Sequence, residues 1–204
     1  MPSRFDEAYA SGTPPWDIGA PQPAFEAVAP SVLARTRDPA RPRLSVLDAG
    51  CGTGENALLF ARAGCDVVGV DSASLAIERA VAKAQARGLR ASFLVADALE
   101  LERLGRTFDV VLDSGLLHTF EDAEQASYVR SLQAVLRPQG SLLLMCMRDM
   151  GRAFSFGPRR LREEQLRAAF REGWLVESLV PAEFATNLQD REFGSAWLLT
   201  ARRL

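Results

Sequence analysis

Short apolar runs alternate with longer segments of helical periodicity through the middle of the chain. The strand-like runs are residues 44–49, 65–70, 91–96, 108–112 and 141–147. Segments with apolar residues at helical spacing lie between them, at residues 57–63, 74–87 and 122–136, and a short helix or turn is expected near 99–104. This alternation predicts an α/β fold with a parallel sheet and helices on both faces.

The last quarter of the chain departs from this alternation. A helix is expected at 162–172, followed by strands at 174–180 and 194–202 without a long crossover between them. Two strands joined in this way favour a hairpin, and hence an antiparallel edge strand on the otherwise parallel sheet. Seven strands are expected in all.

The first 23 residues differ again, because Pro14, Pro15, Pro21 and Pro23 surround Trp16. Prolines at this density forbid a long regular element, so an irregular arm is predicted. A helix at 24–35, kinked or broken at Pro30, and a loop at 37–43 should follow. We expect residues 1–40 to form an N-terminal arm and helix, and residues 41–204 the main domain.

Composition supports an ordinary globular protein. The 204 residues suit one domain, and 48% hydrophobic with 25% charged residues is close to the average for globular chains. The net charge of -2 lacks the positive field that nucleic acids select. We therefore expect no nucleic-acid partner.

Membrane, disulfide and metal roles are also disfavoured. No apolar stretch reaches the roughly 18 residues of a membrane helix, and the N-terminus lacks the apolar core of a secretory signal, so we expect a cytoplasmic protein without a membrane partner. Cys51, Cys65 and Cys146 have no C-x-x-C spacing and only one histidine accompanies them. Reduced thiols and no metal site are predicted.

A glycine turn follows the first strand of the main domain, at Gly50-Cys51-Gly52-Thr53-Gly54. Bare Cα positions and backbone N–H groups there let a ligand approach the main chain closely. A dinucleotide fingerprint would need glycine where Glu55 stands, and no Gly-Lys-Ser/Thr sequence follows for a phosphate loop. The pattern predicts a nucleoside-like ligand without phosphates.

Acidic residues end three consecutive strands. Asp71 lies 19 residues after Gly52, close to the distance at which an acidic residue reaches ribose hydroxyls in nucleotide-binding α/β folds. Asp97 can accept a hydrogen bond from an exocyclic amine such as that of adenine. Together with Asp48, they suit a ligand that carries amino groups and positive charge, which indicates S-adenosylmethionine.

These motifs resemble those of the class I S-adenosylmethionine-dependent methyltransferases, a Rossmann-like family. The resemblance implies that Gly50 and Gly52 lie beside the methionine part of the cofactor and that Asp48 organises the glycine turn. It places Asp71 on the ribose, and Asp97 with Ala98 on the adenine. The cofactor-binding residues implied are Trp16, Asp48, Gly50, Cys51, Gly52, Gly54, Asp71, Ser72, Asp97, Ala98, Asp113 and Ser114.

A narrower resemblance rests on residues 15–19 (PWDIG) and 113–120 (DSGLLHTF). They are similar to motifs of small bacterial methyltransferases for thiols, heterocycles and quinolone-like toxins, relatives of the thiopurine and tellurite-resistance enzymes. The resemblance implies transfer to an O, N or S atom of a small aromatic or heterocyclic acceptor. It also favours Trp16 and residues 1–40 as a lid, rather than Trp16 as a plug on the core, over a methyltransferase domain at 41–204.

The acceptor side of the site is expected after the fourth and fifth strands. His118, the only histidine, is the candidate general base, because its pKa lies near neutrality. The alternative is that it only borders the pocket, since orientation alone can supply most of the rate. Phe120, Arg148 and Phe154 are candidate substrate contacts, and Cys51 is expected to fill space.

Three other functions stay open from the sequence. A nucleic-acid methyltransferase would be favoured by a basic surface, or by an Asn/Asp-Pro-Pro-Tyr/Phe motif where this chain has Asp113-Ser114-Gly115-Leu116. A non-catalytic S-adenosylmethionine-binding module would share the glycine turn but lack turnover. A nicotinamide oxidoreductase is disfavoured by Glu55.

Overall fold

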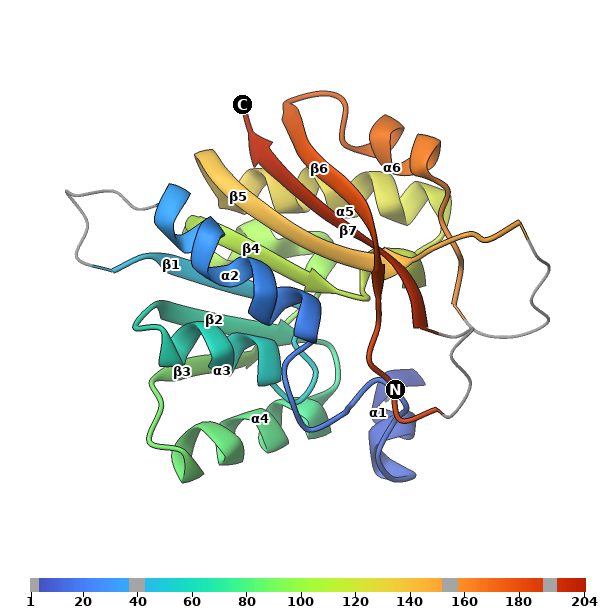
Figure 1. Cartoon of the computed structure of the whole chain (residues 1–204). Helices are drawn as coiled ribbons and strands as arrows, with labels where there is room; N and C mark the ends of the chain where they lie inside the picture. Colours follow the sequence, from blue (N-terminus) through green and yellow to red (C-terminus); the bar gives the residue numbers. More distant parts are fainter. Residues whose placement is uncertain (1–3, 37–42, 152–157, 189–193) are drawn as a thin grey trace.

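A computed structural model describes residues 4–36, 43–151, 158–188 and 194–204, arranged as a central sheet with helices on both faces (Figure 1). The sheet has seven strands in the order β3-β2-β1-β4-β5-β7-β6. The first five are parallel: β1 (Ser45–Ala49), β2 (Asp66–Asp71), β3 (Ala91–Val95), β4 (Phe108–Ser114) and β5 (Leu136–Met147). The predicted mostly parallel α/β sheet is confirmed.

The antiparallel pairing predicted at one edge is also present. β7 (Ser195–Arg203) pairs antiparallel with β5 on one side and with β6 (Trp174–Glu183) on the other. The strand that runs opposite to the others is therefore β7, one place in from the edge. The last quarter of the chain thus extends the sheet beyond β5.

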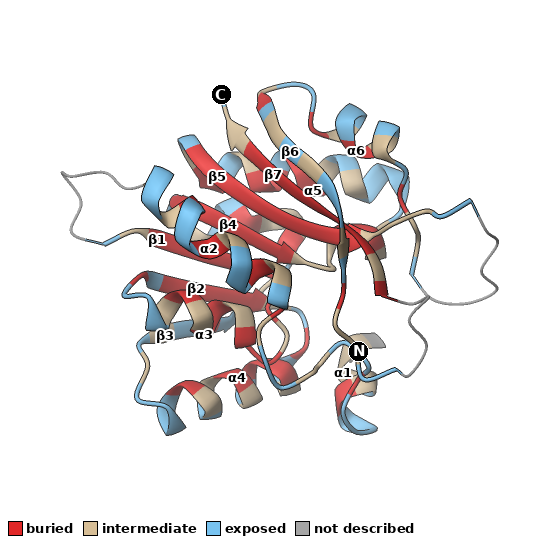
Figure 2. Ribbon diagram, in the orientation of Figure 1, coloured by how far each residue is buried: buried red, intermediate tan, exposed pale blue. Residues whose placement is uncertain are grey.

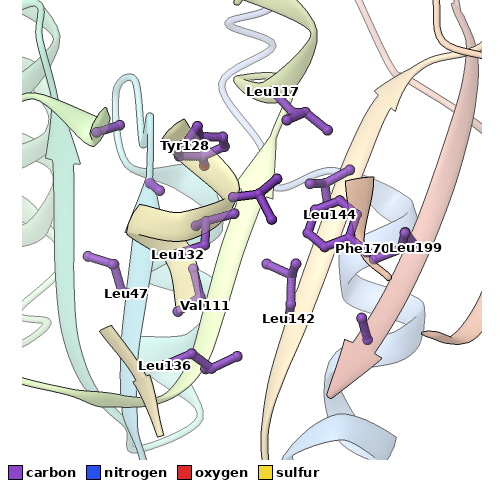
Figure 3. Close-up of a cluster of buried hydrophobic side chains, with 14 of the residues drawn as sticks. Leu47, Val111, Leu117, Tyr128, Leu132, Leu136, Leu142, Leu144, Phe170 and Leu199 are labelled. Carbon is purple, nitrogen blue, oxygen red and sulfur yellow. The ribbon is translucent and has the colours of Figure 1, made fainter. Parts of the chain in front are cut away.

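Two hydrophobic cores lie on opposite faces of the sheet, because successive side chains of a strand point to opposite sides. In β5, Leu142 and Leu144 belong to one core and Leu143 and Met145 to the other. Buried residues predominate in the five inner strands, whereas the edge strands β3 and β6 and the outer surfaces of the helices are largely exposed (Figure 2). Figure 3 shows the first core, in which Tyr128 and Leu132 pack over Leu47 and Val111.

The helices divide between these cores. α2 (Pro23–Thr36), α3 (Glu55–Arg62) and α4 (Ser74–Ala86) supply buried residues to the second core. The 3₁₀ segment η1 (Ala98–Leu104), α5 (Asp122–Val135) and α6 (Glu163–Ala169) supply the first. The helices and the short segment expected in the main domain are all confirmed, within a few residues at their ends.

The N-terminal region is more regular than predicted. A helix, α1 (Arg4–Ala10), precedes the proline-rich stretch, because neither proline nor glycine interrupts these seven residues. α2 runs through Pro30 to Thr36 without a break, with Pro30 exposed. The division into a lid at 1–40 and a domain at 41–204 stays a prediction. In the part of the chain that the structure describes, no helix is long and apolar enough to cross a bilayer.

A buried polar cluster joins the beginnings of three neighbouring strands at the edge opposite the glycine turn. One oxygen of Asp109, Oδ2, accepts hydrogen bonds from the Ser45 N–H and hydroxyl at 2.8 Å each, and Oδ1 accepts one from Arg137 Nη1 at 2.7 Å. Burial alone would raise the pKa of Asp109, but Ser45 and Arg137 hold it below its ordinary value. The ionised carboxylate therefore stabilises the fold.

We expect Asp109→Asn to lower the free energy of unfolding by about 1–3 kcal/mol at neutral pH, because buried partners lose a charged acceptor. The pKa of Asp109 in the unfolded chain is ~4, and its pKa in the native protein is lower. The stabilisation is therefore present above pH ~4 and disappears as the pH falls through the native pKa. Chemical denaturation between pH 3 and 7 measures both effects.

Asp66→Asn is the matched control, because Asp66 pairs with Arg106 at 2.7 Å on an exposed part of the surface. Exposed pairs contribute about 1 kcal/mol or less. Equal loss of stability in the two variants would show that the Asp109 cluster contributes no more than a surface pair.

Candidate functional site

The carboxyl ends of β2, β1 and β4 lie next to one another, and the glycine turn between β1 and α3 occupies the middle of this edge (Figure 1). Gly52 has φ +52°, a conformation that favours glycine, and a Cβ placed on it would lie 2.8 Å from the Tyr9 hydroxyl. Larger residues would therefore strain the turn and displace Tyr9. Open α/β sheets bind ligands at this edge.

Asp71 fastens the glycine turn to the end of β2. Its Oδ2 accepts a hydrogen bond from the Gly52 N–H at 2.8 Å, and its Oδ1 accepts one from the Ala73 N–H at 2.9 Å. Burial raises the pKa of Asp71, although both N–H groups act in the opposite direction. The structure thus brings Asp71 to the glycine turn, and each oxygen keeps a lone pair for a further donor. Its contact with a ribose stays a prediction.

Asp48 lies near the carboxyl end of β1, where the sequence placed it. It is fully buried at the end of β1, and neither carboxylate oxygen has a hydrogen-bond partner of good geometry among the described residues. Burial, together with the like charges of Asp113 and Asp71, raises the pKa of Asp48 to about 7. Asp71, and not Asp48, accepts the Gly52 N–H, so a role of Asp48 in organising the glycine turn stays a prediction.

The buried carboxylate of Asp48, which has no hydrogen-bond partner of good geometry among the described residues, shows whether S-adenosylmethionine suits this site. A buried carboxylate without a partner is costly, so a positive charge near it is favourable. S-adenosylmethionine carries a sulfonium and an ammonium group, and Asp48 lies two residues before Gly50, where the glycine turn begins. The residues present therefore fit this cofactor.

The carboxyl end of β3 lies at the same edge of the sheet, and Asp97, which follows it, is exposed. Asp97 Oδ1 accepts a hydrogen bond from the Leu99 N–H at 2.8 Å and so caps η1. Ala98 is buried behind it, and Ser72 is exposed after β2. The capping geometry leaves the second oxygen of Asp97 for another donor, and the adenine contacts stay predictions.

Asp113 ends β4 and organises the turn that carries His118. It is fully buried, and its oxygens accept the N–H groups of Leu116 at 2.7 Å and Leu117 at 3.0 Å. Burial raises the pKa of Asp113 to about 7, against these hydrogen bonds. Its carboxylate therefore positions η2 (Leu117–Thr119), and Ser114, half-buried, follows it toward the site.

His118 is held in one protonation state. It is 5% exposed, and its Nδ1 accepts a hydrogen bond from the Met147 N–H at 3.0 Å. A neutral ring that accepts at Nδ1 carries its proton on Nε2 and donates there. Burial, and then the charge of Arg160, lower the pKa of His118 to about 3. This arrangement does not suit the predicted general base.

Two other residues expected at the acceptor side make packing contacts, and their contacts with a substrate stay predictions. Phe120 packs against Tyr128 with ring centroids 5.1 Å apart, and the Arg148 guanidinium lies over the Trp197 ring at 4.6 Å. Phe154 lies outside the described residues. Cys51 is buried in the glycine turn, and burial raises the pKa of its thiol, which agrees with a space-filling role.

An aromatic residue of α1 lies beside the glycine turn and was not anticipated. Tyr9 is 2% exposed, and its hydroxyl accepts a hydrogen bond from Trp16 Nε1 at 3.0 Å. Trp16 itself remains 48% exposed, which does not fit a plug on the core. Phe5 and Tyr9, four residues apart in a stretch free of proline, were the available signal for this helix.

The only lysine of the chain joins the arm to the glycine turn, which sequence reasoning also missed. Lys83 Nζ donates to Thr53 Oγ1 at 2.7 Å, and Thr53 Oγ1 donates to Asp17 Oδ1 at 2.9 Å. Lys83 also pairs with Glu55 at 2.9 Å, and Arg87 binds both oxygens of Glu55 at 2.7 and 2.8 Å. The turn and the arm are thus held by one polar network.

This network changes the meaning of Glu55. Burial alone would raise the pKa of Glu55, but Arg87 and Lys83 hold it below its ordinary value. Its negative charge is compensated by two cations, so Glu55 repels a phosphate less than an unpaired carboxylate would. The stronger argument against a dinucleotide is the absence of glycine at this position.

Comparisons with known proteins show what the chain is similar to. A family model described as "Methyltransferase domain" matches residues 46–140. A 2-heptyl-1-hydroxyquinolin-4(1H)-one methyltransferase of Mycobacteroides abscessus is 29% identical over 90% of this chain and 78% of its own length.

Two solved structures cover nearly all of the chain. One, described by the words "Conversion of a disulfide bond into a thioacetal group during echinomycin biosynthesis", is 36% identical, with a TM-score of 0.84 over 100% of this chain and 93% of its own. The other is the 1,6-didemethyltoxoflavin-N1-methyltransferase of Burkholderia thailandensis, 23% identical, with a TM-score of 0.75 over 98% of this chain and 85% of its own. At 23% identity, the similarity to the second structure shows a shared fold.

We expect binding of S-adenosylmethionine to release protons from Asp48 at neutral pH. A carboxyl group with a pKa of about 7 is about half protonated at pH 7. A cation at the glycine turn favours the ionised form, so the pKa falls, up to about half a proton is released, and affinity rises with pH through this range. Isothermal titration calorimetry in buffers of different ionisation enthalpy measures the number of protons released per S-adenosylmethionine bound.

Asp48→Asn should reduce this release, whereas Asp122→Asn, at an exposed position on α5, should not. If Asp48→Asn releases as many protons as the wild type, Asp48 does not sense the charge of the donor.

Proposed function

The chain belongs to the class I S-adenosylmethionine-dependent methyltransferases, and we propose that it transfers the methyl group to an O, N or S atom of a small aromatic or heterocyclic acceptor. The relative from Mycobacteroides abscessus is named for a hydroxyquinolone, which is such an acceptor. The cofactor follows from the family and fits the glycine turn.

The observation that carries the acceptor class is a pair of rings at the end of β4. His118 and Phe184 lie edge to face, with ring centroids 6.0 Å apart and planes at 89°. A Cβ on Gly115 would lie 3.3 Å from His118 Cε1 and 3.5 Å from Phe184 Cζ, so glycine leaves the main chain bare beside both rings. Flat aromatic groups pack well against such surfaces.

The donor is proposed to lie along the edge formed by β1, β2 and β3. Gly50 and Gly52 would receive its methionine part, Asp71 its ribose, and Asp97 with Ala98 its adenine. Trp16 and Tyr9 would cover it from the arm, which excludes water from the site. The cofactor supplies an electrophilic methyl group on a positively charged sulfur, which is a good leaving group.

The acceptor atom forms a bond to the methyl carbon as the bond from that carbon to sulfur breaks, and the electron pair of that bond remains on sulfur. The protein's contribution is to align the acceptor with this bond and to keep water away. His118 supports the alignment by donating from Nε2, because its Nδ1 is already occupied. The acceptor therefore loses its proton to solvent, before or after transfer, and not to His118.

Methyl transfer from labelled S-adenosylmethionine to a panel of thiols, hydroxyquinolones and quinones tests the proposed function, with products identified by mass spectrometry. A methylated heterocycle supports it. Donor binding without transfer to any member of the panel would favour a non-catalytic binding module instead.

The dependence of kcat on pH tests the role of His118. For two acceptors of different acidity, we expect the acid limb of the profile to follow the pKa of each acceptor, in the wild type and in His118→Gln alike. The substitution should lower kcat for both acceptors by a similar factor, about tenfold, because one orienting hydrogen bond is lost.

A limb near pH 6–7 that is common to both acceptors and absent from His118→Gln would identify His118 as a general base. Gln125→Ala is the control, because Gln125 Nε2 donates to the Phe120 carbonyl on the neighbouring turn and not to His118. It should leave the pH profile as in the wild type.

A further inference from the structure

The N-terminal arm is bound to the connection between β6 and β7, at the opposite end of the sequence. Gln22 Nε2 donates to the Ala185 carbonyl at 3.0 Å, and the Ala185 N–H donates to Gln22 Oε1 at 2.9 Å. The two residues are 163 positions apart, and Figure 1 shows the arm and this connection side by side. One side chain thus satisfies both backbone groups of Ala185.

Gln22 also touches the donor side of the molecule. Its backbone N–H donates to Asn56 Oδ1 at 2.9 Å, and Asn56 lies two residues after the glycine turn, in the first turn of α3. Gln22 is only 5% exposed, so water competes little for these hydrogen bonds. It is therefore joined to the glycine turn on one side and to the β6–β7 connection on the other.

A second residue repeats this arrangement. The Asn187 N–H donates to the Pro15 carbonyl at 2.8 Å, and Asn187 Nδ2 donates to the Asp17 carbonyl at 2.7 Å. The Asp17 side chain in turn accepts the Thr53 hydroxyl of the glycine turn. Residues 15–22 thus form a bridge from the glycine turn to residues 184–188.

The β6–β7 connection carries Phe184, the ring that faces His118. A change in the position of the arm is transmitted to Ala185, the neighbour of Phe184. The arm lies over the glycine turn through Tyr9 and Trp16. A continuous chain of contacts therefore links a donor bound at this turn to the Phe184 ring.

We infer that Gln22 is a positioning residue that couples the donor site to Phe184, so that a bound donor fixes this ring in place for the acceptor. The assignment of Phe184 to the acceptor site rests on the proposed function, whereas the coupling itself does not. A bound donor should therefore raise the affinity for the acceptor, and the acceptor should raise the affinity for the donor by the same factor.

Hydrogen–deuterium exchange with and without S-adenosylhomocysteine, the demethylated product of the donor, tests the coupling without an acceptor. At saturating S-adenosylhomocysteine, amide exchange in residues 182–188 of the wild type should slow about tenfold, which corresponds to about 1.4 kcal/mol of added protection. Residues 50–56 and 71–76 should slow as well, because they lie at the donor site.

In Gln22→Met, which keeps the length of the side chain and loses both hydrogen bonds, slowing at 182–188 should fall below about twofold while slowing at 50–56 and 71–76 persists. Gln85→Met, at an exposed position on α4, should behave as the wild type. If the buried substitution prevents folding, Asn187→Ala removes a contact of the same bridge from an exposed position and should reduce the slowing at 182–188.

Two results would overturn the inference. One is a donor-site response at 50–56 with no slowing at 182–188 in the wild type. The other is undiminished slowing at 182–188 in the Gln22 or Asn187 variants. Loss of the response at 50–56 in the wild type would instead contradict donor binding itself, which separates the two failures.

Discussion

The hydrogen bond from the Gly52 N–H to the Asp71 carboxylate is the contact on which the proposed site depends. It fixes a turn of left-handed glycine residues against the neighbouring strand and leaves Asp71 at the exposed edge of the sheet. Asp113 provides the same kind of support one strand further on, where it accepts two N–H groups of the turn before His118. Carboxylates that bind backbone N–H groups therefore shape both the proposed donor side and the proposed acceptor side.

The arm adds a second layer of support. Lys83, Thr53 and Asp17 join it to the glycine turn, while Gln22 and Asn187 join it to the β6–β7 connection. The surface pairs in such a network contribute little individually, but the buried Glu55 is costly to leave without its cations. The same residues that hold the turn thus also hold the segment that covers it.

Local patterns were sufficient to predict the sheet and to select the strand ends where the site is proposed. Short apolar runs identified β1, β4 and β5, and the interval of 19 residues after Gly52 drew attention to Asp71, which the structure bonds to the Gly52 N–H. Contacts between distant segments were not predictable, because no local pattern links Gln22 to Ala185. The protonation state of His118 depends on the Met147 N–H, a partner from the next strand, so the residue type alone suggested a base.

Calorimetric titration of S-adenosylhomocysteine into the wild type and Asp71→Asn tests the central claim most directly, namely that Asp71 and the glycine turn form the donor site. The loss of a charged acceptor is worth about 1.5–3 kcal/mol, so the dissociation constant should rise roughly ten- to a hundredfold. Asp66→Asn, at the other end of the same strand, should bind as the wild type does. Unchanged affinity in Asp71→Asn would contradict the account.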